Sequence, residues 1–421
     1  MNCFLGIDFG TSGARAIVID EKHNIVDTRQ CKFTSIAPGK LAKIWQDTLY
    51  DLIARIPVEI KKTIQAIAIN GTSSTVLLAD ASGKLVTKPI LYNDSRGQDV
   101  LGEIEAIAPD NHVVLSASSS LAKFFWWQKQ SYFDQAGFFL HQADWLGYLL
   151  HGRLGISDYH NALKLGYDVD HLCYPDWLKS LPSSRLFPQV LSPGASIAKV
   201  TSAMAQRLNL PVNCMVKAGT TDSIAAFLAS GANLPGEAVT SLGSTLVLKL
   251  LSRTKVTAAE LGIYSHRLGN LWLTGGASNT GGAVLQHFFT NQQLEELSAQ
   301  IDPKTISPLK YYPLLEPGDR FPINDPHLLP QLEPRPDEAK EFLHGLLESM
   351  SRIESQGYCK LQDLGADRLT QVYTTGGGAK NDVWRKIRQR HLKIPVSLAA
   401  NTEAAYGTAL LAAEQSSVSL S

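Results

Sequence analysis

Close to its first residue the chain reads Phe4-Leu5-Gly6-Ile7-Asp8-Phe9-Gly10-Thr11-Ser12-Gly13-Ala14-Arg15-Ala16-Ile17-Val18-Ile19-Asp20. Two apolar runs flank a turn of Gly, Thr and Ser, which predicts a β-hairpin. Gly10 and Gly13 can adopt backbone angles closed to other residues, so the turn can bend tightly and aim several N–H groups at one anion, such as a phosphate. Asp8, at the end of the first strand, can hold Mg²⁺ or its water shell beside that anion. An ordinary hairpin explains these residues equally well, so the other motifs must decide between the two interpretations.

Length and charge indicate the class of protein. A chain of 421 residues exceeds the size at which one hydrophobic core keeps growing, which predicts two domains with the site in a cleft between them. The composition is 44% hydrophobic and 19% charged, with 39 basic and 39 acidic residues, which is typical of globular proteins without field-driven partners. We therefore expect neither nucleic acid nor an anionic membrane as a partner. The most basic stretch, 380–393, is interpreted as a solvated helix face.

The cysteines indicate a reducing compartment. They are odd in number, widely spaced, and free of CxxC or Cys/His ligand patterns. The five are Cys3, Cys31, Cys173, Cys214 and Cys359. Strand-like sequence begins within a few residues of Met1, and no apolar run approaches the roughly 18 residues that span a bilayer. We expect a cytoplasmic protein with neither signal peptide nor membrane anchor.

Apolar β-like runs alternate with amphipathic helical stretches, which predicts an α/β architecture. In the first half the expected strands are 4–8, 14–20, 64–70 and 75–79, and the expected helices are 40–56, 143–151 and 223–230. Breaker residues cluster at 231–237, so we predict a first domain over 1–232 and a second over 233–421. The second half begins like the first, with a strand, a turn at 242–245 and a strand within 237–251, followed by a strand at 270–276. Two related folds are therefore expected.

A proline-rich stretch interrupts the second half. Seven prolines fall within residues 312–336, so this stretch cannot form a regular helix or a central strand and is expected to run extended over the surface. Apolar spacing predicts a helix with one buried face over 336–358.

Asp222 stands where the polar segment Lys217-Ala218-Gly219-Thr220-Thr221-Asp222-Ser223 runs into a helix of small residues. Asp is a preferred N-cap residue, because its side chain accepts hydrogen bonds from the free N–H groups of the first turn. The functional alternative is that Asp222 accepts a proton from a substrate hydroxyl while the helix dipole helps to neutralise phosphate. Both roles can coexist in one site.

A second glycine turn lies in Val372-Tyr373-Thr374-Thr375-Gly376-Gly377-Gly378-Ala379-Lys380-Asn381-Asp382-Val383-Trp384. Three consecutive glycines leave no side chains, so a flat ring or a phosphate can lie directly on the backbone. A flexible surface turn is the alternative. Asn381 can offer a donor and an acceptor to a base edge, and Trp384 can either pack on the base or belong to the core.

Four motifs occur in the order seen in one family. They are Gly6-Ile7-Asp8-Phe9-Gly10-Thr11 with Arg15, Gly219-Thr220-Thr221-Asp222, Ser241-Leu242-Gly243-Ser244-Thr245 and Thr375-Gly376-Gly377-Gly378-Ala379-Lys380-Asn381-Asp382-Val383-Trp384-Arg385. In these motifs the chain resembles the FGGY family of carbohydrate kinases over nearly its whole length. Two further segments are similar, 313–322 to the family's Pro-rich "GER-P" segment and 395–409 to its closing helix. The resemblance implies a two-domain α/β, actin/Hsp70-like (ribonuclease H-like) ATPase fold with a central interdomain cleft for Mg-ATP. It also implies transfer of the γ-phosphoryl group to a sugar or polyol.

The resemblance further implies roles for single residues. Asp222 would be the general base, Asp8 and Asp222 would organise Mg²⁺, and Thr11 would act with them in catalysis. The implied ATP-binding residues are Gly10, Thr11, Ser12, Gly243, Ser244, Thr245, Gly376, Gly377, Gly378, Asn381 and Trp384. The implied substrate-binding residues are Thr72, Ser73, Asp94, Arg96 and Asp222. Asp94 and Arg96 match the family's "D-x-R" position, with a mutual surface ion pair as the alternative.

Within the family, the short length and Ile69-Asn70-Gly71-Thr72-Ser73-Ser74-Thr75 most resemble the plant and cyanobacterial xylulose-kinase-like pentulose kinases. Gly71-Thr72-Ser73 stands where many xylulokinases carry a Gln-Met-His run, which removes an imidazole from the sugar pocket and disfavours D-xylulose. We predict phosphorylation of D-ribulose to D-ribulose 5-phosphate, with the sugar and ATP as partners, by a monomer or small homo-oligomer. The alternatives are D-xylulose or another polyol as acceptor, or a nucleotide-switch ATPase without a small-molecule acceptor.

Overall fold

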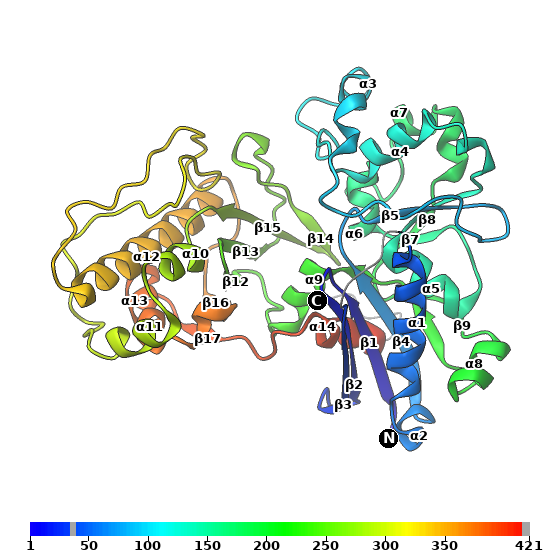
Figure 1. Ribbon diagram of the computed structural model, residues 1–421, viewed down its shortest axis with the longest axis horizontal. Coiled ribbons are helices and arrows are strands. Elements are labelled where there is room, and N and C mark those ends of the chain that lie inside the picture. The colour runs from blue at the N-terminus through cyan, green and yellow to red at the C-terminus, as the bar shows by residue number, and fades with distance from the viewer. Residues whose placement is uncertain (34–38, 415–421) are drawn as a thin grey trace. The chain divides into compact units, whose positions relative to one another are not determined.

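The chain folds into two units. The computed structural model describes residues 1–33 and 39–414 (Figure 1). Among the described residues, contacts group Met1–Ala229 with 403–414 as one unit, and Ser230–Thr402 as the other. The break after Ala229 lies close to the predicted boundary, whereas the last helix, α14 (Ala404–Ala413), belongs to the first unit and not to the second.

The sheet of the first unit has the order β3 (Ile25–Lys32), β2 (Gly13–Asp20), β1 (Cys3–Phe9), β4 (Ile64–Gly71), β10 (Met215–Lys217) and β9 (Ser196–Lys199). β1 and β2 form the predicted antiparallel hairpin, and β4 runs parallel to β1. A short strand, β11 (Thr220–Thr221), continues beside the end of β4. The carboxyl ends of β1, β4 and β11 therefore share one edge of the sheet.

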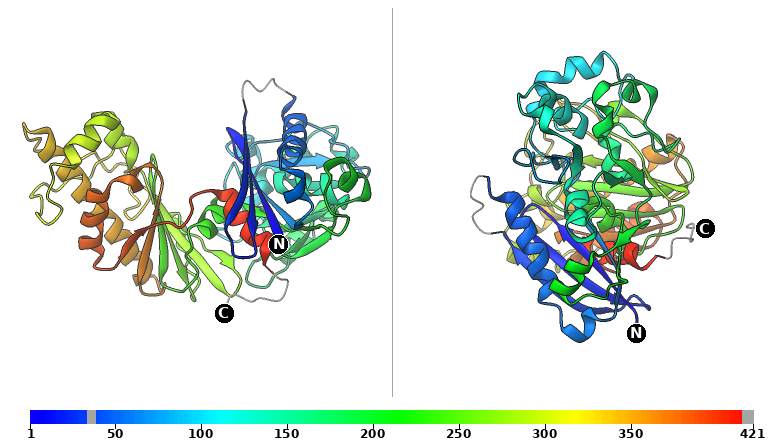
Figure 2. Two further views of the ribbon diagram at one scale, coloured as in Figure 1. Left: turned by 90° about the horizontal axis from the view of Figure 1, so that it is seen from below. Right: turned by 90° about the vertical axis from the view of Figure 1, so that its right-hand side faces the viewer.

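The two faces of this sheet are covered by different helices, because successive side chains of a strand alternate. Leu5, Ile7 and Phe9 pack in one core with residues of α1 (Leu41–Ala54). Phe4 and Gly6 face α14 on the opposite side. The ribbon of α14 lies beside that of β1 (Figure 1 and Figure 2). A Cβ atom at Gly6 would lie 2.1 Å from the carbonyl oxygen of Ala405, so only glycine allows α14 this close. Gly6 therefore permits the last helix to pack directly on the sheet of the first unit, where apolar side chains of α14 join its core.

The second unit repeats this arrangement of strands. Its sheet runs β14 (His266–Leu268), β15 (Leu271–Ser278), β13 (Leu246–Ser252), β12 (Glu237–Leu242), β16 (Gln371–Thr375) and β17 (Val396–Leu398). From β15 to β17 these strands take the places of β3, β2, β1, β4 and β10, and β14 is added at the edge. Apolar side chains of the long helix α12 (Ala339–Asp363) and of α13 (Asp382–Leu392) form the core with this sheet. The expectation of two related folds is confirmed.

Shorter elements complete both units. In the first they are α2 (Val58–Lys61), β5 (Val76–Ala79), η1 (Arg96–Val100), α3 (Leu101–Glu105), α4 (Ser120–Gln128), η2 (Phe133–Gln135), β6 (Phe138–His141), α5 (Gln142–His151), β7 (Ile156–Asp158), α6 (Tyr159–Ala162), η3 (Leu163–Leu165), α7 (Asp176–Lys179), η4 (Pro182–Leu186), β8 (Gln189–Leu191), α8 (Ser202–Leu208) and α9 (Asp222–Ala229). In the second they are η5 (Ala259–Leu261), α10 (Gly282–Phe288), α11 (Asn291–Ser298) and η6 (Gly377–Lys380). The strands and helices predicted for the first half correspond to β1, β2, β4, β5, α1, α5 and α9.

The proline-rich stretch contains neither helix nor strand over 312–336, as predicted. Its predicted surface position is wrong for its aromatic residues, because Phe321 is only 1% exposed and Tyr312 is buried. The Phe321 ring fills the space above Gly276, where a Cβ atom would lie 2.5 Å from the ring. Prolines exclude regular structure, but they do not keep the side chains between them out of the core.

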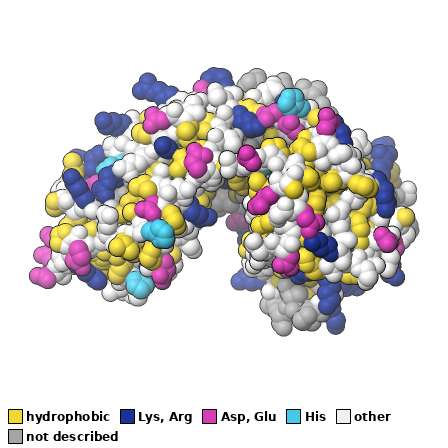
Figure 3. All heavy atoms as spheres, turned by 90° about the horizontal axis from the view of Figure 1, so that it is seen from above, with side chains coloured by type: hydrophobic (Ala, Val, Ile, Leu, Met, Phe, Trp, Pro, Cys, Tyr) yellow, Lys and Arg dark blue, Asp and Glu magenta, His cyan; other side chains and the backbone are white. Residues whose placement is uncertain are grey.

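Two further features concern the charges on one face of the molecule and the lengths of its apolar helices. Lys and Arg side chains are interspersed with Asp and Glu on the face displayed in Figure 3. Among the described residues, no helix combines the length and the apolar character needed to cross a membrane.

Candidate active site

A row of polar side chains crosses the sheet of the first unit near the carboxyl ends of its strands. Arg15 of β2 pairs with Asp8 of β1, Asp8 with Asn70 of β4, and Asn70 with Thr220 of β11. Residues paired in this way project to the same face of a sheet, here the face covered by α14. The row therefore brings a cation, a carboxylate, an amide and a hydroxyl together beside the hairpin turn.

Asp8 is a buried carboxylate beside a second carboxylate. Its pKa is raised to about 6, first by burial and then by the nearby negative charge of Asp222, while Arg15 and a hydrogen bond from Asn70 act in the opposite direction. One of its oxygens, Oδ1, is buried without a hydrogen-bond partner among the described residues. A buried, unpaired oxygen beside a second carboxylate fits the oxygen ligands that Mg²⁺ prefers.

These two carboxylates would supply only part of a metal site. The described residues contain no group of three or more His, Cys, Asp or Glu side chains placed to hold a metal ion. Mg²⁺ usually keeps several waters and binds through one or two carboxylates and the oxygens of phosphate groups. Asp8 and Asp222 therefore fit a cation that arrives with a phosphate ligand, and not a resident structural metal.

Arg15 and Asn70 are held from the α14 side. The Arg15 guanidinium forms an ion pair with Glu403, the residue before α14, and donates to Gln30 at 3.0 Å. Asn70 donates from Nδ2 to Thr408 Oγ1 of α14 at 2.6 Å. The sequence predictions did not include Asn70, although a polar residue at the end of the apolar run 64–70 signals a strand whose end reaches a site.

Asp222 is the first residue of α9, directly after β11. Its Oδ1 accepts a hydrogen bond from the Ser223 backbone N–H at 2.7 Å, so it also stabilises the helix start. Two glycines bring it to the site. A Cβ atom at Gly219 would lie 1.8 Å from the Ile69 carbonyl oxygen, and one at Gly407 would lie 1.9 Å from the Ala225 carbonyl oxygen. The chain before Asp222 therefore lies directly against β4, and α9 lies directly against α14.

The hairpin turn exposes Thr11 and Ser12. Gly10 donates to the Gly13 carbonyl at 3.0 Å, and within the described part of the chain the backbone N–H groups of Thr11 and Ser12 have no partner. The predicted conformational freedom of Gly10 and Gly13 is not used, since neither has a positive φ. Gly13 is needed for space instead, because a Cβ atom there would lie 2.4 Å from the Cys31 carbonyl oxygen.

The predicted sugar-binding residues lie on two loops. Thr72 is buried, and its hydroxyl is engaged by Thr75 Oγ1 at 2.5 Å and Gln142 Oε1 at 3.2 Å. Ser73 is half-buried, and its hydroxyl has no partner among the described residues. Asp94 and Arg96 form the mutual ion pair that was the alternative to sugar binding. Arg96 donates from Nε to Asp94 Oδ1 at 2.9 Å and from Nη2 to Asp94 Oδ2 at 2.6 Å. Ser73 is thus the hydroxyl most available to a ligand.

Two glycine turns lie side by side in the second unit. The turn Gly243-Ser244-Thr245 joins β12 to β13, and Gly376–Gly378 follows β16, the parallel neighbour of β12. Gly376 has φ +84°, and a Cβ atom there would lie 2.6 Å from the Leu242 backbone. Among the described residues, the backbone N–H groups of Ser244, Gly377 and Gly378 have no partner. This surface offers backbone donors without side chains in the way.

Two residues predicted to touch a base are engaged elsewhere. Trp384 is 1% exposed and donates from Nε1 to Ser351 at 3.2 Å, so its ring belongs to the core of the second unit. Asn381 caps α13 by accepting from the Trp384 backbone N–H at 2.9 Å, and it donates to Ser298 of α11 at 2.8 Å. The core alternative for Trp384 is correct, because its ring is buried against Ser351 of α12.

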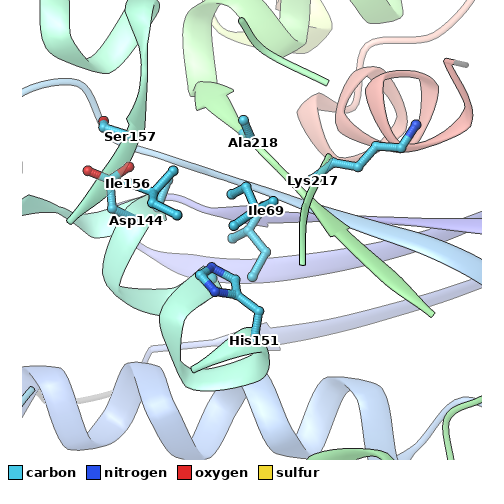
Figure 4. Close-up of a pocket in the computed structure, with 11 residues that line it drawn as sticks. Ile69, Asp144, His151, Ile156, Ser157, Lys217 and Ala218 are labelled. Atoms are coloured by element: carbon cyan, nitrogen blue, oxygen red, sulfur yellow. The ribbon is translucent and has the colours of Figure 1, made fainter. Parts of the chain in front are cut away.

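A small cavity lies behind the central strands of the first unit (Figure 4). Its lining includes Ile69, Asp144, Ser157 and Gly219, and its volume of about 10 Å³ holds a water molecule at most. Lys217 reaches away from it toward α14, where it donates to the Glu414 carbonyl. The cavity is too small for a sugar, so the acceptor must bind elsewhere.

Both units match domains of one known protein family. The family described as the FGGY family of carbohydrate kinases, N-terminal domain, matches residues 3–229, and its C-terminal domain matches residues 238–415. A xylulose kinase of Staphylococcus epidermidis is 21% identical over 97% of this chain and 87% of its own length. The Escherichia coli xylulose kinase is 24% identical over 91% of this chain and 84% of its own. The crystal structure of a xyloylose kinase from Brucella ovis superposes with a TM-score of 0.83, at 24% identity, covering 98% of this chain and 90% of that one.

Proposed function

Because the chain belongs to the FGGY family of carbohydrate kinases, we propose that this ATP-dependent sugar kinase phosphorylates a pentulose, D-ribulose, to D-ribulose 5-phosphate. The observation that carries the proposal is the row Arg15, Asp8, Asn70 and Thr220 with Asp222 beside it. Phosphoryl transfer needs an oriented acceptor hydroxyl and neutralisation of spreading charge, and little covalent chemistry.

Asp222 acts as the general base in this proposal. It lies at the start of α9, near Asp8, and the Ser223 backbone orients its carboxylate by donating to Oδ1. The positive end of the α9 dipole favours the carboxylate form, and the approaching phosphate benefits from the same field. The acceptor proton thus moves to Asp222 as the acceptor oxygen bonds to the γ-phosphorus of ATP, the bond from that phosphorus to the β,γ-bridging oxygen breaks, and ADP leaves.

Asp8 and Asp222 would hold Mg²⁺, and the ion, when bound, would neutralise charge on the phosphates. Asp8 is suited to this role because its unpaired Oδ1 gains a partner and its repulsion with Asp222 is relieved. Thr11 and Ser12 offer backbone N–H groups to phosphate oxygens. In the second unit, the turns at Gly243–Thr245 and Gly376–Gly378 offer the same kind of donor to the nucleotide.

The acceptor binds in the first unit against Ser73 and the Asp94–Arg96 pair. Small hydroxyl side chains at 72–75 favour D-ribulose over a sugar that needs an imidazole partner. D-Xylulose is the second candidate, because the relatives that match most of the chain are named xylulose kinases. The cytoplasm is the proposed location, since all five cysteines are free in the structure.

The test is ADP release from Mg-ATP with D-ribulose, D-xylulose, L-ribulose, glycerol or no sugar, with the phosphorylated product identified by mass. We expect D-ribulose to stimulate ADP release most and to yield a pentulose phosphate. A stronger response to D-xylulose would transfer the assignment to that sugar. Equal ADP release in every reaction, with no sugar phosphate, would contradict the kinase proposal and favour a nucleotide switch.

A further inference from the structure

Lys123 is a fully buried cation that no part of the proposed chemistry uses. It lies in α4 and is 0% exposed. Its Nζ donates to the carbonyl oxygens of Ser74 at 2.8 Å, Leu91 at 2.6 Å and Tyr92 at 3.3 Å. A buried ammonium group is costly unless its donors are satisfied, and here all three N–H groups have carbonyl partners. Lys123 thus binds three backbone carbonyls at once.

The three carbonyls belong to the two loops that carry the predicted sugar-binding residues. Ser74 follows Thr72 and Ser73 at the end of β4, and Leu91 and Tyr92 precede Asp94 and Arg96. A second link joins the same loops, because Tyr92 donates its backbone N–H to Thr75 Oγ1 at 3.0 Å. Lys123 is therefore the point at which both loops are tied to one helix.

Ser74, one of the carbonyl partners of Lys123, has an unusual backbone conformation. Ser74 has φ +62°, in the left-handed region that residues other than glycine rarely adopt, and its Oγ is buried without a partner among the described residues. The turn it belongs to closes through the Thr75 N–H to the Thr72 carbonyl at 3.1 Å. A strained backbone of this kind persists only because neighbouring groups hold the residue in place, and Lys123 is one of them.

The same helix also holds the second loop through Trp126, one turn beyond Lys123. The Arg96 guanidinium lies 4.6 Å from the centre of the Trp126 ring, a cation–π contact. At Gly97 the chain approaches α4 so closely that a Cβ atom would lie 2.5 Å from Ala122 Cβ. Through these contacts, α4 holds both the loop of Asp94 and Arg96 and the turn that contains Ser73.

We propose that Lys123 is a positioning residue that sets the spacing between loops 72–75 and 91–96, and through it the fit of the acceptor sugar. The inference rests on the proposed function, since it assigns the acceptor to these loops. Lys123 does not touch the sugar in this scheme. Its loss lets Ser73 move relative to Asp94 and Arg96, so the enzyme binds the sugar less well without losing its base or its nucleotide contacts.

The experiment compares Lys123→Met with Lys61→Met. Lys61 is a matched control, because it is also buried and donates to a backbone carbonyl, that of Ala54 at 3.1 Å, but in α2, which carries none of the site residues. For Lys123→Met we expect the KM for the pentulose to rise about tenfold or more, with a smaller change in kcat and an unchanged KM for ATP. For Lys61→Met we expect no change in any of the three. If Lys123→Met does not fold, Lys123→Gln, which keeps two N–H donors, is measured in its place and should change the KM in the same direction by less.

Hydrogen exchange provides the second readout, independent of turnover. Peptides covering 72–75 and 91–96 should exchange faster in Lys123→Met than in the wild type and in Lys61→Met, and both loops should change together. Unchanged exchange in both loops, or an unchanged pentulose KM in an active enzyme, would overturn the role of Lys123. If the wild type phosphorylates no sugar, the proposed function fails. Faster exchange in both loops of Lys123→Met would then support only the structural role of Lys123, which is to hold the two loops together.

Discussion

The two sheets share five strand positions, and β1 and β12 hold the same place in them, yet the two strands carry charge differently. A glycine follows each strand. Phe9 and Ala14 enclose the four-residue turn Gly10–Gly13 of the first unit, and Leu242 and Leu246 enclose the three-residue turn Gly243–Thr245 of the second. Before the glycine of each turn, the first unit has Asp8 paired with Asn70, and the second has Ser241 paired with Thr375. The same kind of strand and turn thus offers unpaired backbone N–H groups twice and a carboxylate once. In the proposed function, the first unit would therefore perform the chemistry and the second would present uncharged backbone to the nucleotide.

The two units also differ in whether a buried carboxylate has a cation as its partner. In the second unit Arg388 and Glu354 form a buried two-point pair, at 2.6 and 2.7 Å, which Thr240 and Thr374 complete. In the first unit Asp158 is 1% exposed and has no cation within hydrogen-bond distance among the described residues. The buried carboxylate of Glu354 is therefore paired with a cation, whereas the pKa values of Asp8 and Asp158 in the first unit are raised.

Removal of the Asp222 charge should have the largest effect. In Asp222→Asn the acceptor hydroxyl loses its base, so we expect kcat for sugar phosphorylation to fall about 10³-fold. ATP binding, measured by calorimetry, should remain within about twofold of wild type if the second unit provides most of the nucleotide contacts. A folded Asp222→Asn protein with normal sugar turnover would end the assignment of the base and with it the contrast between the units.

Substitution at equivalent positions tests the contrast directly. Asp8→Asn removes a carboxylate that fits Mg²⁺, so we expect kcat to fall about 10²-fold. Ser241→Ala, at the matching position of β12, should change kcat less than threefold. The Mg²⁺ dependence of the residual activity is the accompanying measurement, since Asp8→Asn alone should require more Mg²⁺. Equal losses in the two variants would mean that both units contribute side chains to the chemistry.

Much of this arrangement could be predicted from the sequence, because it is local. Glycine turns between apolar runs, an Asp at a strand end and an Asp at a helix start are patterns of a few residues, and β1, β2, β12, β13 and α9 form where they predict. The burial of Trp384 is not local, since it depends on Ser351 of α12. The return of α14 to the first unit depends on Gly6, far away in the chain. The sequence contains one indication that Lys123 is buried. It is the single charged residue in the apolar run Leu121-Ala122-Lys123-Phe124-Phe125-Trp126-Trp127.

The glycine turn of the second unit provides a smaller test with its own control. Gly376 has φ +84°, and a Cβ atom there would lie 2.6 Å from the Leu242 backbone, so Gly376→Ala should lower the free energy of unfolding by about 1–3 kcal/mol and raise the KM for ATP several-fold. A Cβ atom at Gly377 would have no neighbouring atom within 4 Å, so Gly377→Ala should leave stability unchanged. Urea unfolding and ATP titrations measure both. Equal stability of the two variants would show that the turn is not fixed by its contact with β12.

The smallest expected effect concerns the buried carboxylate of the first unit. The pKa of Asp158 is raised to about 7, first by burial and then by the nearby Asp144 carboxylate. The folded protein then keeps a proton that the unfolded chain releases above its ordinary pKa near 4, so this residue lowers the free energy of unfolding as the pH rises from about 4 to about 7. Asp158 caps α6 by accepting from His160 and Asn161 N–H groups, and Asn is an equally good cap.

Asp158→Asn should therefore keep the fold and remove this pH dependence. The variant should match the wild type near pH 4 and exceed it near pH 7 by about 1–3 kcal/mol in urea unfolding. The protonated Asp158 carboxyl can donate a hydrogen bond to Asn161. Asn161 Oδ1 is buried without a partner among the described residues, and rotation of the Asn161 amide would turn this oxygen toward Asp158. Glu354→Gln is the matching change in the second unit, and it should be destabilising at both pH values, because it leaves Arg388 buried without its countercharge. If Asp158→Asn instead lost stability at pH 7, the carboxylate would be ionised and paired in the fold, and the contrast between the buried charges of the two units would fail.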